Sequence, residues 1–139
     1  MPYPAIDLSS ICTYHLGERR NLVTRKDLIG PQGPCPPFEN RDLESVAHQV
    51  ILARQAGRPV ICMFGAHVIK CGLSPLLIAL LEERVFTHLA TNGAGSIHDM
   101  ELALIGETSE DVADSIEDGT FGMAEETGAL INGAVQAGM

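Results

Sequence analysis

Hydrophobic residues follow a helical rhythm directly after residue 40. In D-L-E-S-V-A-H-Q-V-I-L-A, apolar side chains recur every three or four positions from Leu43 to Ala53, and Gly57 follows. This spacing places apolar side chains on one side of a helix, and glycine is common where a helix ends. The pattern therefore predicts an amphipathic helix that begins near Arg41 and ends before Gly57.

Two predicted strands, with a predicted helix between them, come next. R-P-V-I-C-M-F-G contains a continuous apolar run of strand length that ends at Gly65, which is typical of a strand covered on both faces in a parallel sheet. L-S-P-L-L-I-A-L-L-E-E-R has Ser74 and Pro75 at cap and first-turn positions and is expected to form a strongly apolar helix. F-T-H-L-A-T-N-G, from Phe86 to Gly93, is expected to form the second strand. This order of elements predicts a βαβ unit and an α/β fold with a parallel sheet.

Three further helices are expected beyond Gly95. The first runs through residues 97–105, the second begins with Thr108 or Ser109 as its cap, and the third covers residues 123–139. Only two strands precede them, and a two-stranded parallel sheet is not a complete domain. We therefore expect a chain that is truncated at its C-terminus, or one that completes its sheet with a partner.

Residues 1–40 have a different texture from the rest of the chain. The stretch G-P-Q-G-P-C-P-P-F contains four prolines, each of which fixes φ and removes a backbone donor. The sequence therefore predicts an irregular N-terminal arm over residues 1–40 and a single α/β domain over residues 41–139.

Composition narrows the possible partners. With 45% hydrophobic and 19% charged residues the chain is that of a globular protein. Its net charge of −9, with only nine Lys and Arg, argues against a surface that follows nucleic-acid phosphates. The apolar runs are too short to cross a bilayer, and no basic leader precedes them, so we expect a cytoplasmic protein without a membrane partner.

Glycine and polar residues gather where both predicted strands end. G-A-H-V-I-K-C-G runs from Gly65 to Gly72, and T-N-G-A-G-S-I-H-D-M-E runs from Thr91 to Glu101. In an open parallel sheet, ligands bind at the carboxyl ends of the strands, where glycines and helix N-termini can hold an anion such as a pyrophosphate. The two segments predict a site for a phosphate-bearing small molecule; the alternative is that they only form turns, since neither is G-x-G-x-x-G.

The same segments resemble deoxyhypusine synthase over roughly residues 41–104. A-H-V-I-K-C-G is similar to that family's S-N-L-I-S-S-G, and T-N-G-A is similar to its T-A-G-G. The resemblance is to a bacterial or archaeal group of unassigned function, and it implies a Rossmann-like fold, NAD as cofactor and a homo-oligomer, either a dimer or a tetramer. The implied cofactor contacts are Ala66, His67, Cys71, Gly72, Thr91, Asn92, Gly93 and Ala94. Serines of the family motif are replaced here, and the family's catalytic lysine belongs to a portion that this chain lacks.

His98, His67, Asp99 and Glu101 are the candidates for proton chemistry. A neutral imidazole can move a proton near pH 7, as NAD-linked dehydrogenation of an amine, followed by transfer, would require. The same four residues could instead bind zinc or manganese in a hydrolase of a C–N bond. Two other interpretations stay open: the histidines and acids serve only hydrogen bonding and helix capping, or the chain is a non-catalytic domain that associates with its own kind.

Overall fold

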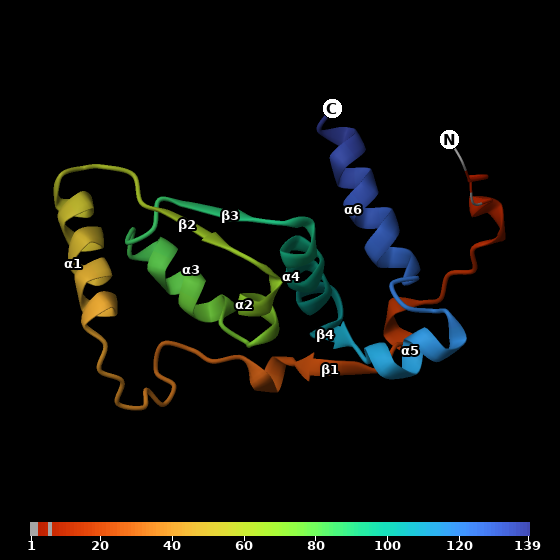
Figure 1. Cartoon of the computed structure of the whole chain (residues 1–139), viewed down its shortest axis with the longest axis horizontal. Coiled ribbons are helices and arrows are strands. Elements are labelled where there is room, and N and C mark those ends of the chain that lie inside the picture. Colours follow the sequence, from red (N-terminus) through yellow and green to blue (C-terminus); the bar gives the residue numbers. More distant parts are fainter. Residues whose placement is uncertain (1–2, 6) are drawn as a thin grey trace. The chain divides into compact units, whose positions relative to one another are not determined.

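Helices and short strands alternate along the chain in the computed structural model, which describes residues 3–5 and 7–139 (Figure 1). The α-helices are α1 (Arg41–Gln55), α2 (Ala66–Lys70), α3 (Ser74–Glu82), α4 (Gly93–Ile105), α5 (Val112–Asp118) and α6 (Glu125–Ala137). The strands are β1 (Asn21–Thr24), β2 (Ile61–Phe64), β3 (His88–Thr91) and β4 (Glu107–Glu110), and 3-10 turns cover Leu8–Ser10, Leu16–Glu18 and Arg25–Asp27. The predicted α/β class is confirmed. None of the described helices has the length and apolar character needed to span a bilayer.

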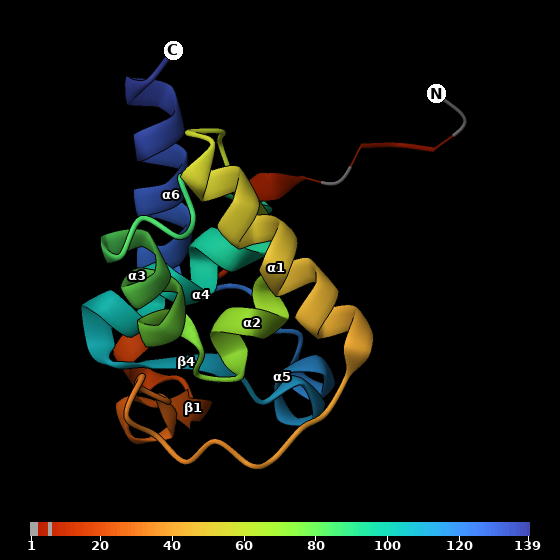
Figure 2. The ribbon, with the colours of Figure 1, turned by 90° about the vertical axis from the view of Figure 1, so that its left-hand side faces the viewer.

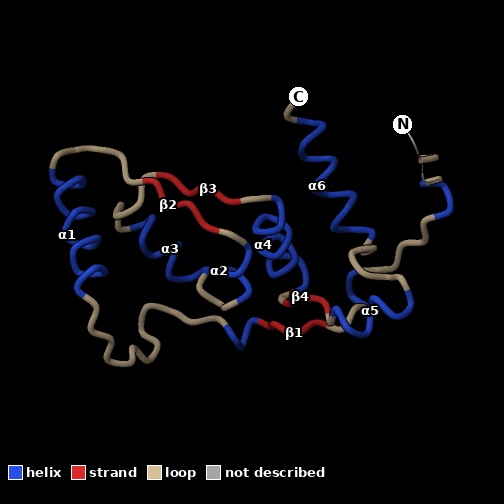
Figure 3. The backbone as a smooth tube through the Cα atoms, viewed as in Figure 1, coloured by secondary structure: helices blue, strands red, loops and turns tan. Residues whose placement is uncertain are grey.

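The chain divides into two compact units. Residues 23–108 form one, here called the central unit; residues 1–22 and 109–139 form the other, here called the terminal unit. The boundaries of these units differ from the predicted ones, which placed an irregular arm over residues 1–40 and a domain over residues 41–139. Residues 1–22 group with the last part of the chain, whereas the loop that precedes α1 groups with the βαβ elements (Figure 3).

The predicted βαβ arrangement is present in the central unit. Strands β2 and β3 are parallel, with Ile61 opposite His88 and Phe64 opposite Thr91. Helices α2 and α3 lie between the two strands in the chain, and α4 follows directly after β3. A second two-stranded sheet joins β1 and β4.

One face of the β2–β3 sheet is covered and the other is open. The core is formed by Ile69 of α2, Leu77 of α3 and Leu102 of α4, and Cys62 and Phe64 of β2 pack against it. The intervening residues of β2 point the other way: Ile61 is 58% exposed and Met63 is 80% exposed. The prediction that this strand is covered on both faces is therefore wrong, because the three helices after it all contribute to the same core.

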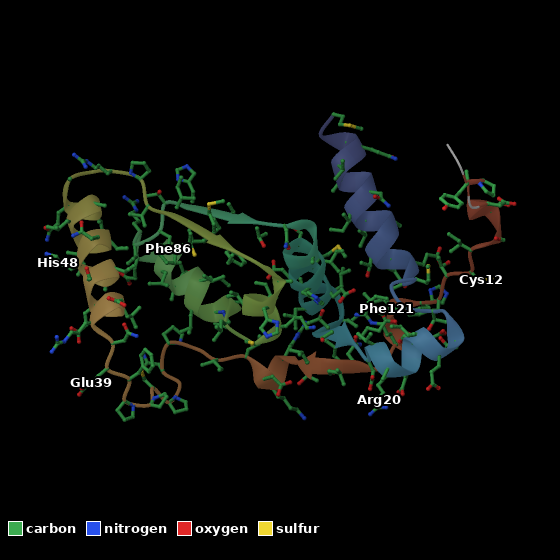
Figure 4. The ribbon with its side chains drawn as sticks, viewed as in Figure 1. Cys12, Arg20, Glu39, His48, Phe86 and Phe121 are labelled. Carbon is green, nitrogen blue, oxygen red and sulfur yellow. The ribbon has the colours of Figure 1, made fainter. Side chains whose placement is uncertain are left out.

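Helix α1 is the predicted amphipathic helix, but its apolar side is exposed. Asn40 caps it, since the Asn40 side-chain oxygen accepts hydrogen bonds from the backbone N–H groups of Asp42 and Leu43. No residue of the helix is buried, and Leu43 and Val46 are more than half exposed. Figure 2 places α1 nearest the viewer as a separate helix, and Figure 4 shows His48 projecting outward from it.

The prediction of a helix capped by Thr108 or Ser109 is wrong. Residues Glu107–Glu110 form strand β4, and α5 begins only at Val112. The Thr108 hydroxyl is buried and donates a hydrogen bond to the side chain of Glu101 instead of capping a helix. Ser109 has a φ of 66°, outside the range of a right-handed helix. A tertiary contact therefore overrides the local capping signal at this point.

Candidate functional site

A pocket of about 360 Å³ lies at the carboxyl ends of β2 and β3 in the central unit. Phe64 and Thr91 are the last residues of the two strands and both line it. The rest of the lining comes from the elements after these strands. The full lining is Phe64, Ile69, Ser74, Leu77, Ile78, Leu89, Thr91, Gly95, Ser96, Asp99 and Met100. We call this the strand-end pocket; its position is the one at which open parallel sheets bind ligands.

The pocket is mostly apolar and carries few polar groups. Asp99 supplies a carboxylate, and no Lys, Arg or His lines the pocket. The Ser74 hydroxyl is buried and has no hydrogen-bond partner among the described residues. An unpartnered buried hydroxyl costs roughly 1–3 kcal/mol, so a group that completes its hydrogen bonding would be favoured here. The lining suits a small molecule with an apolar ring system and hydroxyl or amine groups.

The glycine-rich turn after β3 brings α4 close to the strand. A methyl group on the buried Gly95 would overlap the Thr91 hydroxyl, so glycine is needed for this close approach. Asn92 caps α4, because its side-chain oxygen accepts a hydrogen bond from Gly95 N at 3.0 Å. Thr91, Asn92 and Gly95 therefore fix the first turn of α4 beside the pocket.

Glu101, Thr108 and His98 form a hydrogen-bonded chain on α4 and β4. The Thr108 hydroxyl donates to Glu101 Oε2 at 2.6 Å, and His98 Nδ1 lies 2.7 Å from the same hydroxyl oxygen. Glu101 is 1% exposed and Thr108 is 0% exposed. This arrangement fits the tautomer of His98 in which Nδ1 carries the proton and donates it to Thr108. In the neutral imidazole the lone pair is then on Nε2, the nitrogen that can accept a proton.

The structure separates the four residues predicted for proton chemistry. His98 and Glu101 are brought together, with His98 Nδ1 3.9 Å from Glu101 Oε2. Asp99, between them in the chain, lines the strand-end pocket, which neither of them lines. His67 is exposed in the first turn of α2. Over residues 3–5 and 7–139, no group of three or more His, Cys, Asp or Glu is placed to hold a metal ion.

The residues implied as cofactor contacts lie mainly at helix ends. Of these, Thr91 lines the pocket. Gly72 has a φ of 76° and is packed against the Asp27 backbone, and its carbonyl accepts a hydrogen bond from Ile29 N at 2.8 Å. The others flank α2 or form the start of α4: Ala66, His67, Cys71, Asn92, Gly93 and Ala94.

For Ser74 and Thr108, the sequence predicted a role that differs from the one in the structure. Ser74 was predicted as a helix cap, whereas it is the first residue of α3, lines the strand-end pocket and has a buried hydroxyl. Thr108 was also predicted as a cap, and its role depends on Glu101, seven residues earlier. Neither role leaves a local signal, because each depends on how separate elements pack.

The terminal unit contains its own polar cluster. Tyr14 Oη donates to Glu110 Oε1 at 2.7 Å, and Gly122 N donates to Glu110 Oε2 at 2.9 Å. Burial, together with the hydrogen bond to Glu110 and its negative charge, raises the pKa of Tyr14 to about 12. Both carboxylate oxygens are thus occupied, which indicates a structural role for this cluster.

No protein-family model matches the chain, and neither a curated protein nor a solved structure matches it significantly.

Proposed function

We propose that this chain binds a nucleotide of the NAD class, with a nucleoside part held in the strand-end pocket. The observation that carries the proposal is that Asp99 and the unpartnered Ser74 line one pocket with Phe64 and Thr91, the last residues of two parallel strands. In Rossmann-like folds, nucleotides bind at this edge of the sheet and an acidic side chain accepts hydrogen bonds from the ribose. The proposal includes a Rossmann-like arrangement and the relation to deoxyhypusine synthase.

The pocket suits a base and a ribose better than a whole dinucleotide. A volume of about 360 Å³ is at the lower end of the range of small-molecule sites, roughly 300–1,000 Å³. Phe64, Leu77 and Met100 offer apolar contacts to a base, while Asp99 and Ser74 offer hydrogen bonds to hydroxyl groups. The remaining part of the ligand would extend beyond the pocket.

The phosphates would lie at the start of α4. This helix begins at Gly93 and spans 13 residues, so its first turn carries a positive partial charge and N–H groups that favour an anion. Gly93 and Ala94 are both exposed there. If the bound nucleotide supports dehydrogenation of an amine, His98 is the proton acceptor that we propose, in the tautomer whose Nδ1–H donates to Thr108.

Isothermal titration of the full chain with NAD, NADP and adenosine tests this proposal. We expect saturable binding of NAD and adenosine that becomes about ten-fold or more weaker in Asp99→Asn, because a hydrogen bond to a charged group is worth roughly 1.5–3 kcal/mol. Asp42→Asn, on the exposed start of α1, is the matched control and should bind like the wild type. Absence of NAD and adenosine binding, or equal weakening in both variants, would refute the proposal.

The same titration series includes zinc and manganese. Stoichiometric metal binding that is lost in His98→Ala, together with no response to nucleotides, would favour the metal-dependent hydrolase instead.

We also propose that the chain assembles with a second copy of itself. Its accessible surface is 10,468 Å², whereas two separate compact units of these sizes would expose about 8,400 Å². In a symmetric dimer, covering the excess would bury roughly 4,000 Å² in total, which is typical of obligate interfaces. The apolar surfaces available in the central unit are the open face of β2, with Ile61 and Met63, and the α1 stripe of Leu43 and Val46. Sedimentation velocity over a concentration series tests the assembly.

A further inference from the structure

Three arginine side chains surround a hollow of about 260 Å³ in the central unit, at the end of the sheet opposite to the strand-end pocket. They are Arg54, Arg58 and Arg84. Val60 and Thr87, which directly precede β2 and β3, line the same hollow. We call it the arginine hollow. It belongs to the amino ends of the strands, so none of its lining is shared with the strand-end pocket.

This concentration of positive charge is unusual for so acidic a chain. The protein has a net charge of −9, and its nine Lys and Arg include these three arginines. In the described part of the chain, the ion pairs formed by arginine do not involve any of the three. Glu82 and Glu83 precede Arg84 in the sequence, but neither lines the hollow. Within the described residues, the three guanidinium groups are therefore not neutralised by an ion pair.

The backbone holds Arg58 in a defined place. Gly57 has a φ of 66°, and Arg58 N donates to the carbonyl of Ala53 at 2.9 Å, which is the hydrogen-bond pattern of a Schellman cap on α1. Pro59 follows and fixes its own φ. Arg54 lies in the last turn of the same helix, so the capped end of α1 presents both side chains to the hollow.

Arg84 occupies a position where glycine is usual. It has a φ of 55° just after α3, and Val85 N donates to Leu80 O at 2.8 Å, so Arg84 is the left-handed residue of a second Schellman cap. A side chain at this φ is strained relative to glycine. Arginines near helix C-termini do complement the helix dipole, but that effect does not require an arginine in the left-handed position. The strained residue instead adds a third guanidinium to the same hollow.

We propose that the arginine hollow binds the phosphate group of a small ligand, either free phosphate or a phosphomonoester. The planar guanidinium presents paired N–H donors that match phosphate oxygens, and it stays charged at all relevant pH values. Three positive charges suit a dianion better than a singly charged carboxylate. The volume of about 260 Å³ suits one phosphate group with a small substituent.

Isothermal titration of the full chain with inorganic phosphate and with phenyl phosphate, at constant ionic strength, tests this inference. We expect saturable one-to-one binding of at least one of them, and affinity about ten-fold or more lower in Arg54→Gln and Arg84→Gly. Arg41→Gln removes an exposed arginine that does not line the hollow, and should leave binding unchanged. Tighter binding of inorganic phosphate would indicate a site for the free ion, whereas tighter binding of phenyl phosphate would indicate a site for a phosphomonoester.

Thermal unfolding separates binding from folding in these variants. Glycine relieves the left-handed strain at residue 84, so Arg84→Gly should unfold at the same temperature as the wild type or higher while losing the ligand. Absence of saturable binding of both probes would overturn the inference, as would equal weakening in Arg41→Gln. Retention of wild-type affinity in both Arg54→Gln and Arg84→Gly would overturn it too. Asp99→Asn should bind phosphate with wild-type affinity, because Asp99 lines the strand-end pocket and not the arginine hollow. This variant therefore distinguishes phosphate binding in the hollow from nucleotide binding in the strand-end pocket.

Discussion

Tyr14 shows how one buried hydrogen bond makes stability depend on pH. Burial and the Glu110 carboxylate raise its pKa from 10.0 to about 12, because the folded terminal unit disfavours the phenolate. The unfolded chain therefore loses this proton first as the pH rises. The stabilising contribution is complete below the ordinary pKa and is lost as the pH rises through the folded-state value.

We predict that the part of the tyrosinate absorbance that comes from Tyr14 appears only near pH 12 in the native protein. The sequence has two tyrosines, and Tyr14→Phe leaves Tyr3, so the difference between the two titrations isolates Tyr14. Glu110→Gln removes the negative charge and should lower the pH at which Tyr14 titrates. A native Tyr14 that titrates near pH 10 would contradict the described contact.

Sequence reasoning at single residues succeeded where the cause was local. His98 and Glu101 are three positions apart, which places them on neighbouring parts of one helix face, and the structure brings them together. Asn92 and Gly95 stand in a stretch recognisable as a strand-to-helix turn. The Ser74 hydroxyl could not be predicted to lack a partner, because that depends on which groups surround it after folding.

At the scale of elements, the Thr108 hydroxyl connects β4 to α4 through Glu101 and His98. We predict that Thr108→Val, which keeps the shape but removes the hydroxyl, lowers the free energy of unfolding by about 1–3 kcal/mol, since a buried carboxylate oxygen loses its donor. Thr13→Val, at an exposed position, should change it by less than about 0.5 kcal/mol. Chemical denaturation of both variants checks this; equal stability of Thr108→Val and wild type would refute it.

The elements predicted from periodicity are α1, β2, α3, β3, α4 and α6, and each is confirmed within a few residues. Apolar runs or apolar residues at helical spacing made these elements predictable, although they did not predict which faces are buried. Strand β4 was missed because E-T-S-E is polar and resembles a helix start. The open face of β2 could not be predicted either. An apolar run indicates that burial of the strand is favourable, but it does not show which element covers each face.

For the whole molecule, exposed apolar surface is the feature that calls for explanation. Met63 is 80% exposed on the open sheet face. A lysine at this position would place a charge inside any interface that covers this face. We predict that Met63→Lys raises the dissociation constant for self-association at least ten-fold, about 1.4 kcal/mol, while the helical content measured by circular dichroism is unchanged.

Ile116→Lys is the control for this prediction, because Ile116 is an exposed apolar residue of α5 in the terminal unit. Sedimentation velocity should show the wild-type association in this variant. A wild-type protein that stays monomeric at all concentrations would refute the assembly proposal. Unchanged association in Met63→Lys would place the interface away from the open sheet face, and equal loss in both variants would show that the effect is not specific to this face.

The terminal unit is built from two segments that are far apart in the chain. Leu16 N donates to Glu126 Oε2 at 2.7 Å, and Tyr14 N donates to Met123 O at 3.2 Å, so residues 1–22 depend on residues 109–139. During synthesis on a ribosome, the first segment emerges long before its counterpart. The central unit has all of its residues available by then and can fold first. The early segment must wait as an unpaired stretch, exposed to chaperones and proteases, until residues 109–139 have also emerged.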